Sequence, residues 1–305
     1  MKVLVSGGTG FVGRAVVRQL HAAEHEICLV VRDPLSPHAR RLVKDYGVRS
    51  LQGNLHQPGS LRSACEGQEA IIHLAGIISE IRANTFESVH VQGTRHLVES
   101  ARDAKIKKWV HMSALGARPN ARSRYHQTKW AGEELVRAAG LDYTVFRPSI
   151  IYGSGDAFVN LFASLARFSP FIPLIGGGHC KLQPIAVDLA AHCFVRALEE
   201  TKAIGKYFDL CGPEPLSLRE LVDSILEVTR SKRIRLTIPM KLARVQACIC
   251  ELVFPAIFNR AAPLNRDQLL MLQEDNVGDP DPAKLLFQLD QRPFREGIKA
   301  QLKCR

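Results

Sequence analysis

The chain has no CxxC pair among its eight cysteines, which argues against a zinc site and against a disulfide framework. We therefore expect no bound metal and a cytoplasmic location, with the inner face of the membrane as an alternative. The sequence does not open on a charged leader with an apolar plug and a cleavage site, so export is not expected. Repeats and low-complexity linkers are also lacking, and 305 residues, 46% of them apolar, suffice for a large core.

Acidic residues are fewer than basic ones, 30 against 41, and the formal net charge is +11. This balance favours anionic partners such as phosphorylated cofactors, acidic lipid surfaces or nucleic acid. Nucleic acid is the least favoured of these, because no basic stripe interleaved with aromatic residues, no zinc-finger spacing and no RNA-binding signature occurs. The oligomeric state is left open.

Residues 1–13, MKVLVSGGTGFVG, pass from an extended pattern to a helical one across a group of glycines. The glycines fit two dinucleotide-binding spacings, Gly8-x-Gly10-x-x-Gly13 and Gly7-x-x-Gly10-x-x-Gly13. Glycine permits a left-handed turn, lets backbone N–H groups approach a pyrophosphate, and packs helix against strand. The N-terminus of the following helix attracts phosphate. The stretch therefore predicts a nucleotide site.

The choice of cofactor depends on the end of the second predicted strand, residues 26–31, which leads into Arg32 and Asp33. An acidic residue about 20 positions past the glycines binds the ribose 2′-hydroxyl of NAD, whereas an arginine there suits the 2′-phosphate of NADP. Arg32 stands 19 residues after Gly13. We expect NADP (NADPH) in preference to NAD, with a solvated arginine at a strand end as the alternative interpretation.

The pattern then alternates strands with helices, which is typical of a parallel α/β sheet. Strands are predicted at 48–51, 69–75, 108–113 and 206–210, and helices at 37–46, 86–104 and 218–228. We expect a Rossmann-type, doubly wound, mainly parallel sheet. Residues 1–150 would form an NAD(P)-binding domain, and residues 151–305 a smaller C-terminal α/β lobe interleaved with it. The proline-rich stretch 168–174 is expected to form no regular element.

Residues that follow the predicted strands are candidates for contact with the cofactor. Asn54 keeps a donor and an acceptor for the adenine base. Ala75 and Gly76 are small enough for the cofactor to pass close to the backbone. His73 lies among apolar residues, so a buried structural histidine is the expected role.

The second functional pattern is Tyr125-x-x-x-Lys129, whose two side chains share a face of a helix. A phenol must lower its pKa from about 10 toward 7 to act as acid or base, which costs about 3 to 4 kcal/mol. An ammonium about 4 Å away, at an effective dielectric constant of about 20, supplies about 4 kcal/mol. Lys129 is therefore expected to lower the pKa of Tyr125 and to bind the nicotinamide ribose.

With the glycine turn and the Tyr125 and Lys129 pair, the run RPSIIYG at 147–153 makes the chain resemble the short-chain dehydrogenase superfamily. It is most similar to the extended and atypical branches, and within these to bacterial relatives of the nucleotide-binding accessory subunit of respiratory complex I, a group linked to quinone metabolism. The resemblance runs through about residue 210, touches 267–277 and thins elsewhere. It implies catalytic roles for Tyr125, Lys129 and Ser113. The residues implied to bind the cofactor are Gly7, Gly8, Thr9, Gly10, Phe11, Val12, Gly13, Arg32, Asn54, Leu55, Leu74, Ala75, Gly76, Lys129, Pro148 and Ile151.

One departure from the family concerns the serine or threonine that polarises the substrate oxygen just past the fifth strand. Alignment places Ala114 there, with Ser113 one residue early. If the strand continues through Ala114, Ser113 faces the wrong way; if the chain has already turned, Ser113 can substitute. Losing such a partner costs a hundredfold to ten-thousandfold in rate. The Ser-Tyr-Lys site is therefore incomplete in sequence, and whether the protein is an enzyme is left open.

Residues 230–260 join a cluster of basic residues to the apolar run 245–258. The run is too short to span a bilayer. We expect a core or dimer helix with a solvated basic lead-in, and the alternative is contact with an acidic membrane surface or a membrane complex.

Three functions follow. The first is an NADP-dependent oxidoreductase linked to quinone or respiratory-chain metabolism, with a small quinone-like or lipid-like substrate. The second is a non-catalytic NADPH-binding subunit or assembly factor of a membrane complex. The third is a sugar-nucleotide epimerase or reductase.

Overall fold

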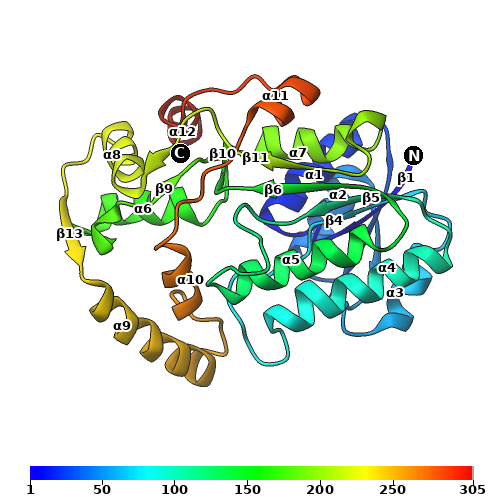
Figure 1. Cartoon of the computed structure of the whole chain (residues 1–305), viewed down its shortest axis with the longest axis horizontal. Coiled ribbons are helices and arrows are strands. Elements are labelled where there is room, and N and C mark those ends of the chain that lie inside the picture. Colours follow the sequence, from blue (N-terminus) through cyan, green and yellow to red (C-terminus); the bar gives the residue numbers. More distant parts are fainter. Residues whose placement is uncertain (304–305) are drawn as a thin grey trace. The chain divides into compact units, whose positions relative to one another are not determined.

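The structure is a computed structural model that describes residues 1–303, and it divides into two compact units (Figure 1). The first unit comprises Met1–Ile78, Ala83–Arg147 and Ala190–Phe208. The second comprises Ser79–Arg82, Pro148–Leu189 and the chain from Asp209 onward. Within residues 1–303, no helix combines the length and the apolar character needed to cross a membrane.

The first unit is organised around a seven-stranded sheet of order β11-β6-β5-β4-β1-β2-β3. Its strands are β1 (Lys2–Ser6), β2 (Glu26–Val31), β3 (Arg49–Gln52), β4 (Ala70–His73), β5 (Lys108–Met112), β6 (Asp142–Pro148) and β11 (Lys206–Leu210). The strands from β3 to β6 along this order pair in parallel. The order reverses direction between β1 and β4, so the carboxyl ends of these two strands flank the crevice where such sheets bind ligands.

Helices cover the sheet on both faces (Figure 1). They are α1 (Phe11–Ala22), α2 (Pro37–Tyr46), α3 (Pro58–Cys65), α4 (Gly93–Asp103), α5 (Arg124–Arg137) and α7 (Val187–Arg196). One core joins α3, α4 and α5 to the sheet through side chains such as Leu61, Leu97 and Val136. The predicted helix 86–104 begins with a π-helical turn, η1 (Glu87–Gln92), before α4 continues it. The predicted fold class is confirmed.

The second unit is built from short strands and helices around its own core. Its elements are β7 (Ile151–Tyr152), α6 (Phe158–Phe168), β8 (Phe171–Ile175), β9 (Lys181–Leu182), β10 (Ile185–Ala186), β12 (Leu216–Ser217), α8 (Leu218–Val228), β13 (Ile234–Ile238), α9 (Met240–Val253), the π-helix η4 (Phe254–Phe258), α10 (Arg266–Met271), α11 (Asp281–Phe287) and α12 (Phe294–Lys303). A reciprocal capping box, Ser217 with Glu220, begins α8 where the sequence predicts a helix.

Two expectations for this unit were wrong. Residues 168–174 were expected to form no regular element, but β8 pairs in parallel with β13 through Pro173. The pair is a two-stranded sheet, so both strands are edges and Pro173 can turn its missing N–H away from the partner. The interpretation of 245–258 as a core helix is also wrong, because α9 buries only Ala243 and Ala247.

Candidate functional site

The glycine turn has the geometry that only glycine allows. Gly7 adopts a left-handed φ of +77°, and a Cβ there would lie 2.8 Å from the backbone nitrogen of Ala75. A Cβ on Gly13 would overlap the carbonyl oxygen of Gly7. Gly8 has no left-handed φ, and its nearest neighbour is a side-chain atom of Leu29. Of the two predicted spacings, Gly7-x-x-Gly10-x-x-Gly13 is therefore the one that the steric contacts support.

The N-terminus of α1 is suited to an anion. Gly10 caps the helix without a side-chain hydrogen bond, and the first turn contains no acidic residue. The leading N–H groups are therefore not capped by a carboxylate, and the helix dipole adds positive potential. The crowding around Gly7 and Gly13 keeps the turn tight enough for a pyrophosphate to approach the backbone. These residues fit a dinucleotide.

A cavity of about 280 Å³ opens at the carboxyl ends of β1, β2 and β4. Ser6 lines it at the end of β1, Gly7 and Arg32 directly after β1 and β2, and Ala75 and Gly76 from the segment after β4. Neither aspartate nor glutamate occurs among its lining residues in the described chain. A phosphorylated ligand would therefore meet no carboxylate in this cavity.

Arg32 also borders an adjoining hollow that is lined by polar side chains and backbone from residues 52–60. The side chain of Arg32 is exposed. Asp33, which could favour NAD, accepts a hydrogen bond from the backbone N–H of Leu35 at 2.9 Å. Its carboxylate is thereby engaged in the turn after β2. Asn54 also bonds locally, accepting from the N–H of His56 at 3.0 Å.

Lys129 contacts the end of β5, which Ser113 follows. Lys129 is buried, and its Nζ donates to the carbonyl oxygen of Met112 at 2.6 Å. A Cβ on Gly76 would lie 3.5 Å from the same Nζ, so the ammonium lies next to this lining residue, although Lys129 itself does not line the cavity. β5 ends at Met112, but the N–H of Ser113 still donates to the carbonyl oxygen of Phe146 in β6 at 2.7 Å, so the substitution of Ser113 for the missing hydroxyl stays a prediction. Ser113 Oγ is buried without a hydrogen-bond partner among residues 1–303.

The ring of Tyr125 lies against aromatic neighbours. Edge-to-face contacts join it to Phe86, His90 and His126, with ring centroids 5.3–5.9 Å apart. Burial raises the pKa of Tyr125 to about 12 and lowers the pKa of Lys129 to about 8. The expectation that Lys129 draws the phenol toward neutrality was wrong, because burial is the cause of the shift and it raises the phenol pKa. At neutral pH the phenol is protonated and suits the role of an acid.

Two buried histidines support the site, and only His73 was recognised in the sequence. His73 contacts Ser6 Oγ at 2.5 Å and Thr94 Oγ1 at 3.1 Å, and burial lowers its pKa to about 3. The predicted structural role of His73 is confirmed. His90 accepts from the N–H of Ile77 at 3.1 Å and contacts Thr128 Oγ1 at 2.9 Å. Burial lowers the pKa of His90 to about 2, so both rings are neutral.

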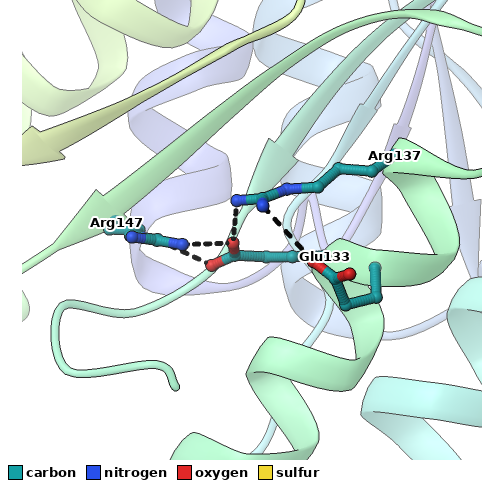
Figure 2. Close-up of polar contacts among 4 residues, drawn as sticks. Glu133, Arg137 and Arg147 are labelled. Atoms are coloured by element: carbon teal, nitrogen blue, oxygen red, sulfur yellow. Dashed lines mark hydrogen bonds and ion pairs between the residues drawn. The ribbon is translucent and has the colours of Figure 1, made fainter. Parts of the chain in front are cut away.

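Helix α5 is fixed to β6 by a buried ion cluster. Glu133, four residues after Lys129, is fully buried and receives a fork of hydrogen bonds from Arg147, at 2.9 and 2.6 Å. Arg137 donates to the same carboxylate at 3.0 Å, so two guanidinium groups converge on it (Figure 2). The Arg147 guanidinium also lies 4.2 Å from the ring centroid of Tyr207. Burial lowers the pKa of Lys129, and the negative charge of Glu133 acts in the opposite direction.

The structure brings a large part of the predicted cofactor set together. The predicted residues that line the cavity are Gly7, Thr9, Gly10, Arg32, Asn54, Leu55, Leu74, Ala75 and Gly76. Gly8, Phe11, Val12 and Gly13 lie in the turn or in α1, while Pro148 and Ile151 belong to the second unit. The lining residues that were missed are Ser6, Val30, Val31, Gly53, His56, Ile77, Asn84 and Val89. Many of these residues end or follow a predicted strand, so their position in the sequence could have identified them.

Residues 7–157 match a protein-family model described as NAD(P)H-binding. The matched range contains the glycine turn, Arg32, Ser113, Tyr125 and Lys129. This match identifies an NAD(P)H-binding domain in residues 7–157. The predicted cofactor class is thus confirmed as NAD(P)H.

Curated relatives support the resemblance predicted from the sequence. The chain is 28% identical over 287 residues to the mitochondrial NADH dehydrogenase [ubiquinone] 1 alpha subcomplex subunit 9 of Arabidopsis thaliana, covering 92% of this chain and 71% of that protein. It is 37% identical over 196 residues to a ceramide reductase of Caulobacter vibrioides, covering 63% and 60%. It is 29% identical over 330 residues to a 2-alkyl-3-oxoalkanoate reductase of Stenotrophomonas maltophilia, covering 98% of each.

The fold is also that of a solved epimerase. The UDP-glucose 4-epimerase of Thermus thermophilus, in complex with NAD, superposes with a TM-score of 0.75 at 19% identity and covers 99% of this chain and 98% of its own. The chain is an NAD(P)-binding, oxidoreductase-like protein with a Rossmann-like fold that matches this epimerase.

Proposed function

We propose that this NAD(P)H-binding protein is an NADP-dependent reductase of a carbonyl group on a lipid-like or quinone-like substrate. The observation that carries the proposal is the proximity of Lys129 Nζ to Gly76, a residue that lines the nucleotide cavity. The buried hydroxyl of Ser113, which has no hydrogen-bond partner among residues 1–303, follows the same strand that Lys129 contacts. Two relatives are named reductases, one of ceramide and one of an oxoalkanoate, which supports a lipid-like carbonyl substrate. The complex I relative supports a quinone-like one.

The preference for NADP rests on charge. Arg32 offers a guanidinium to a 2′-phosphate, and the cavity lining contains no carboxylate in the part of the chain described. The Asp33 carboxylate accepts a hydrogen bond from the backbone N–H of Leu35. Asp33 does not line the cavity, whereas Arg32 does, so a 2′-phosphate in the cavity gains a charged partner.

Three side chains have separate roles in the proposed reduction. When bound, NADPH supplies the hydride that reduces the carbonyl carbon. Tyr125, protonated at neutral pH, donates its proton to the carbonyl oxygen and recovers one from solvent. Lys129, one helical turn after Tyr125, would hold the nicotinamide ribose and supply positive charge to the site. Ser113 donates a hydrogen bond to the same carbonyl oxygen.

Oxidation of NADPH by a panel of long-chain 3-oxo compounds and quinones tests this proposal. We expect turnover with at least one class and its loss in Tyr125→Phe. The matched control is Tyr46→Phe, whose ring packs against His21 away from the site and should retain turnover. Binding of NADPH without oxidation by any member of the panel would contradict the reductase.

The second candidate is a non-catalytic NADPH-binding subunit of a membrane complex, with the membrane contact in residues 230–260. Ala114 favours it, because this side chain has no hydroxyl where catalytic relatives carry one. The complex I relative points the same way. A sugar-nucleotide epimerase or reductase is the third, supported by Tyr125 and Lys129 and weakened by the displaced serine. Bound NADPH that resists every acceptor but co-purifies with membrane proteins would favour the subunit.

A further inference from the structure

Helix α9 exposes large apolar side chains where a surface helix normally carries polar ones. Leu242, Val245, Ile249 and Leu252 are each 55–69% exposed. At 3.6 residues per turn they fall within about 80° of arc, so they form one stripe. In η4 the stripe is followed by Ile257 and Phe258, which are 70% and 56% exposed. We call these six residues the α9 apolar face.

The opposite side of α9 is the one that packs on the protein. Its buried residues are Ala243 and Ala247, and they pack in a small cluster with Leu269 of α10. The helix therefore buries its small residues and leaves its large apolar ones outside. Exposure of this apolar area is unfavourable in water, so the face is expected to contact another apolar surface.

The surroundings of the α9 apolar face are basic. Residues 229–266 contain eight lysines or arginines and a single acid, Glu251. Glu251 is paired with Arg266 at 2.6 Å. Lys241 and Arg244, on α9 itself, are exposed and make no ion pair with any residue from 1 to 303. Two cations without an ion pair among residues 1–303 therefore lie on the same helix as the α9 apolar face.

We propose that the α9 apolar face lies in the interface of a lipid bilayer that contains anionic lipid. An apolar stripe flanked by cations is the pattern of helices that lie in the membrane surface. The 14 residues of α9 are too few to cross the hydrocarbon core, so the helix would lie in the plane of the membrane. Lys241 and Arg244 would meet lipid phosphates while the stripe reaches the acyl chains.

A second copy of the chain is a poorer occupant. A twofold interface brings the same patch of both copies together, so Lys241 and Arg244 would face like charges. The only acid of the segment is already paired with Arg266. An anionic bilayer supplies both the apolar surface and the opposite charge. This inference extends the membrane contact of the second candidate function, and it does not depend on the reductase chemistry.

Vesicle co-sedimentation of the full-length protein, without NADPH, tests the proposal. The vesicles are pure phosphatidylcholine or phosphatidylcholine with about one third phosphatidylglycerol, at low and at high salt. We expect binding to the anionic vesicles only, weakened by salt. Lys241→Gln with Arg244→Gln should weaken binding about 30-fold, from about 1 kcal/mol for each cation. The charge control is Arg95→Gln with Arg102→Gln, two exposed arginines of α4.

The apolar contribution is tested by Leu242→Ser with Leu252→Ser, whose side chains are 59% and 69% exposed. Its control is Leu161→Ser with Leu285→Ser, at 56% and 78% exposed on other helices. We expect the first pair to lose at least tenfold in vesicle affinity and the control to keep wild-type affinity. Equal losses in both pairs, or no binding of the wild type to anionic vesicles, would overturn the proposal.

Hydrogen exchange on the wild type gives a readout that needs no variant. Anionic vesicles should slow amide exchange in residues 240–258 and leave the glycine turn unchanged. Sedimentation equilibrium without vesicles then separates the rival occupant. A dimer that the Leu242→Ser and Leu252→Ser pair converts to monomer, while vesicle binding stays at the wild-type level, would assign the face to a second copy and overturn the membrane proposal.

Discussion

Replacing Glu133 by glutamine should destabilise the first unit strongly, although the two side chains have nearly the same shape. Glu133 is fully buried and accepts two hydrogen bonds from Arg147 and one from Arg137 (Figure 2). Glutamine keeps one acceptor oxygen but removes the buried negative charge on which the two guanidinium groups converge. Breaking a buried ion pair costs about 3–5 kcal/mol. Both arginines keep some contact with solvent, so we expect a loss of about 3 kcal/mol, at the lower end of that range.

The neighbouring residue provides the control. Glu134 also pairs with Arg137, at 3.3 Å, but its side chain is 51% exposed. Exposed pairs contribute about 0–1 kcal/mol, so Glu134→Gln should unfold close to the wild type. Urea unfolding at neutral pH measures both variants. If Glu133→Gln loses no more stability than Glu134→Gln, the cluster does not hold α5 on β6 as we describe.

The same substitution should be visible at the site. Glu133 opposes the lowering of the Lys129 pKa, so Glu133→Gln should move that pKa further below its value of about 8. The ribose contact needs the ammonium, and NADPH affinity should therefore fall at a lower pH in the variant than in the wild type. An unchanged pH midpoint would show that the carboxylate acts on stability alone.

Three further outcomes are expected. Lys129 loses its proton at about pH 8 in the folded protein and at about 10.5 when unfolded, so the unfolded state binds more protons between these values. The free energy of unfolding should rise by up to about 3 kcal/mol across this window relative to Lys129→Met; a flat difference would refute the shift. Gly13→Ala places a Cβ against the oxygen of Gly7 and should abolish NADPH binding in a calorimetric titration, which retained affinity would contradict. Ser113→Ala should reduce kcat at least a hundredfold and leave NADPH affinity unchanged. An unchanged kcat would show that the Ser113 hydroxyl has no role in the reaction.

Local steric rules explain why the nucleotide turn could be predicted from the sequence. A tight turn between a buried strand and a helix needs glycine at Gly7 and Gly13, and the structure places backbone atoms where any side chain would collide. β2 and β11 were also predicted to the residue, because each is a short run with a distinct boundary. Local composition determines these features, so the sequence reveals them.

Features that depend on tertiary contacts could not be predicted. The role of His90 comes from its contacts with Ile77 and Thr128, which are distant in sequence. The orientation of Ser113 depended on where β5 ends, and its pattern fits either ending. The periodicity of α9 shows an apolar stripe but not which side of the helix the protein covers. The prediction for the pKa of Tyr125 was wrong because it considered the charge of Lys129 and omitted the effect of burial.

The most direct test of the account is a fluorescence titration of the purified chain with NADPH and with NADH. The account predicts saturable binding of both, at least tenfold tighter for NADPH, because a charged hydrogen bond to the 2′-phosphate contributes about 1.5–3 kcal/mol. Arg32→Ala should remove that advantage and leave NADH affinity unchanged. Absence of binding to either nucleotide, or a preference that survives Arg32→Ala, would contradict it.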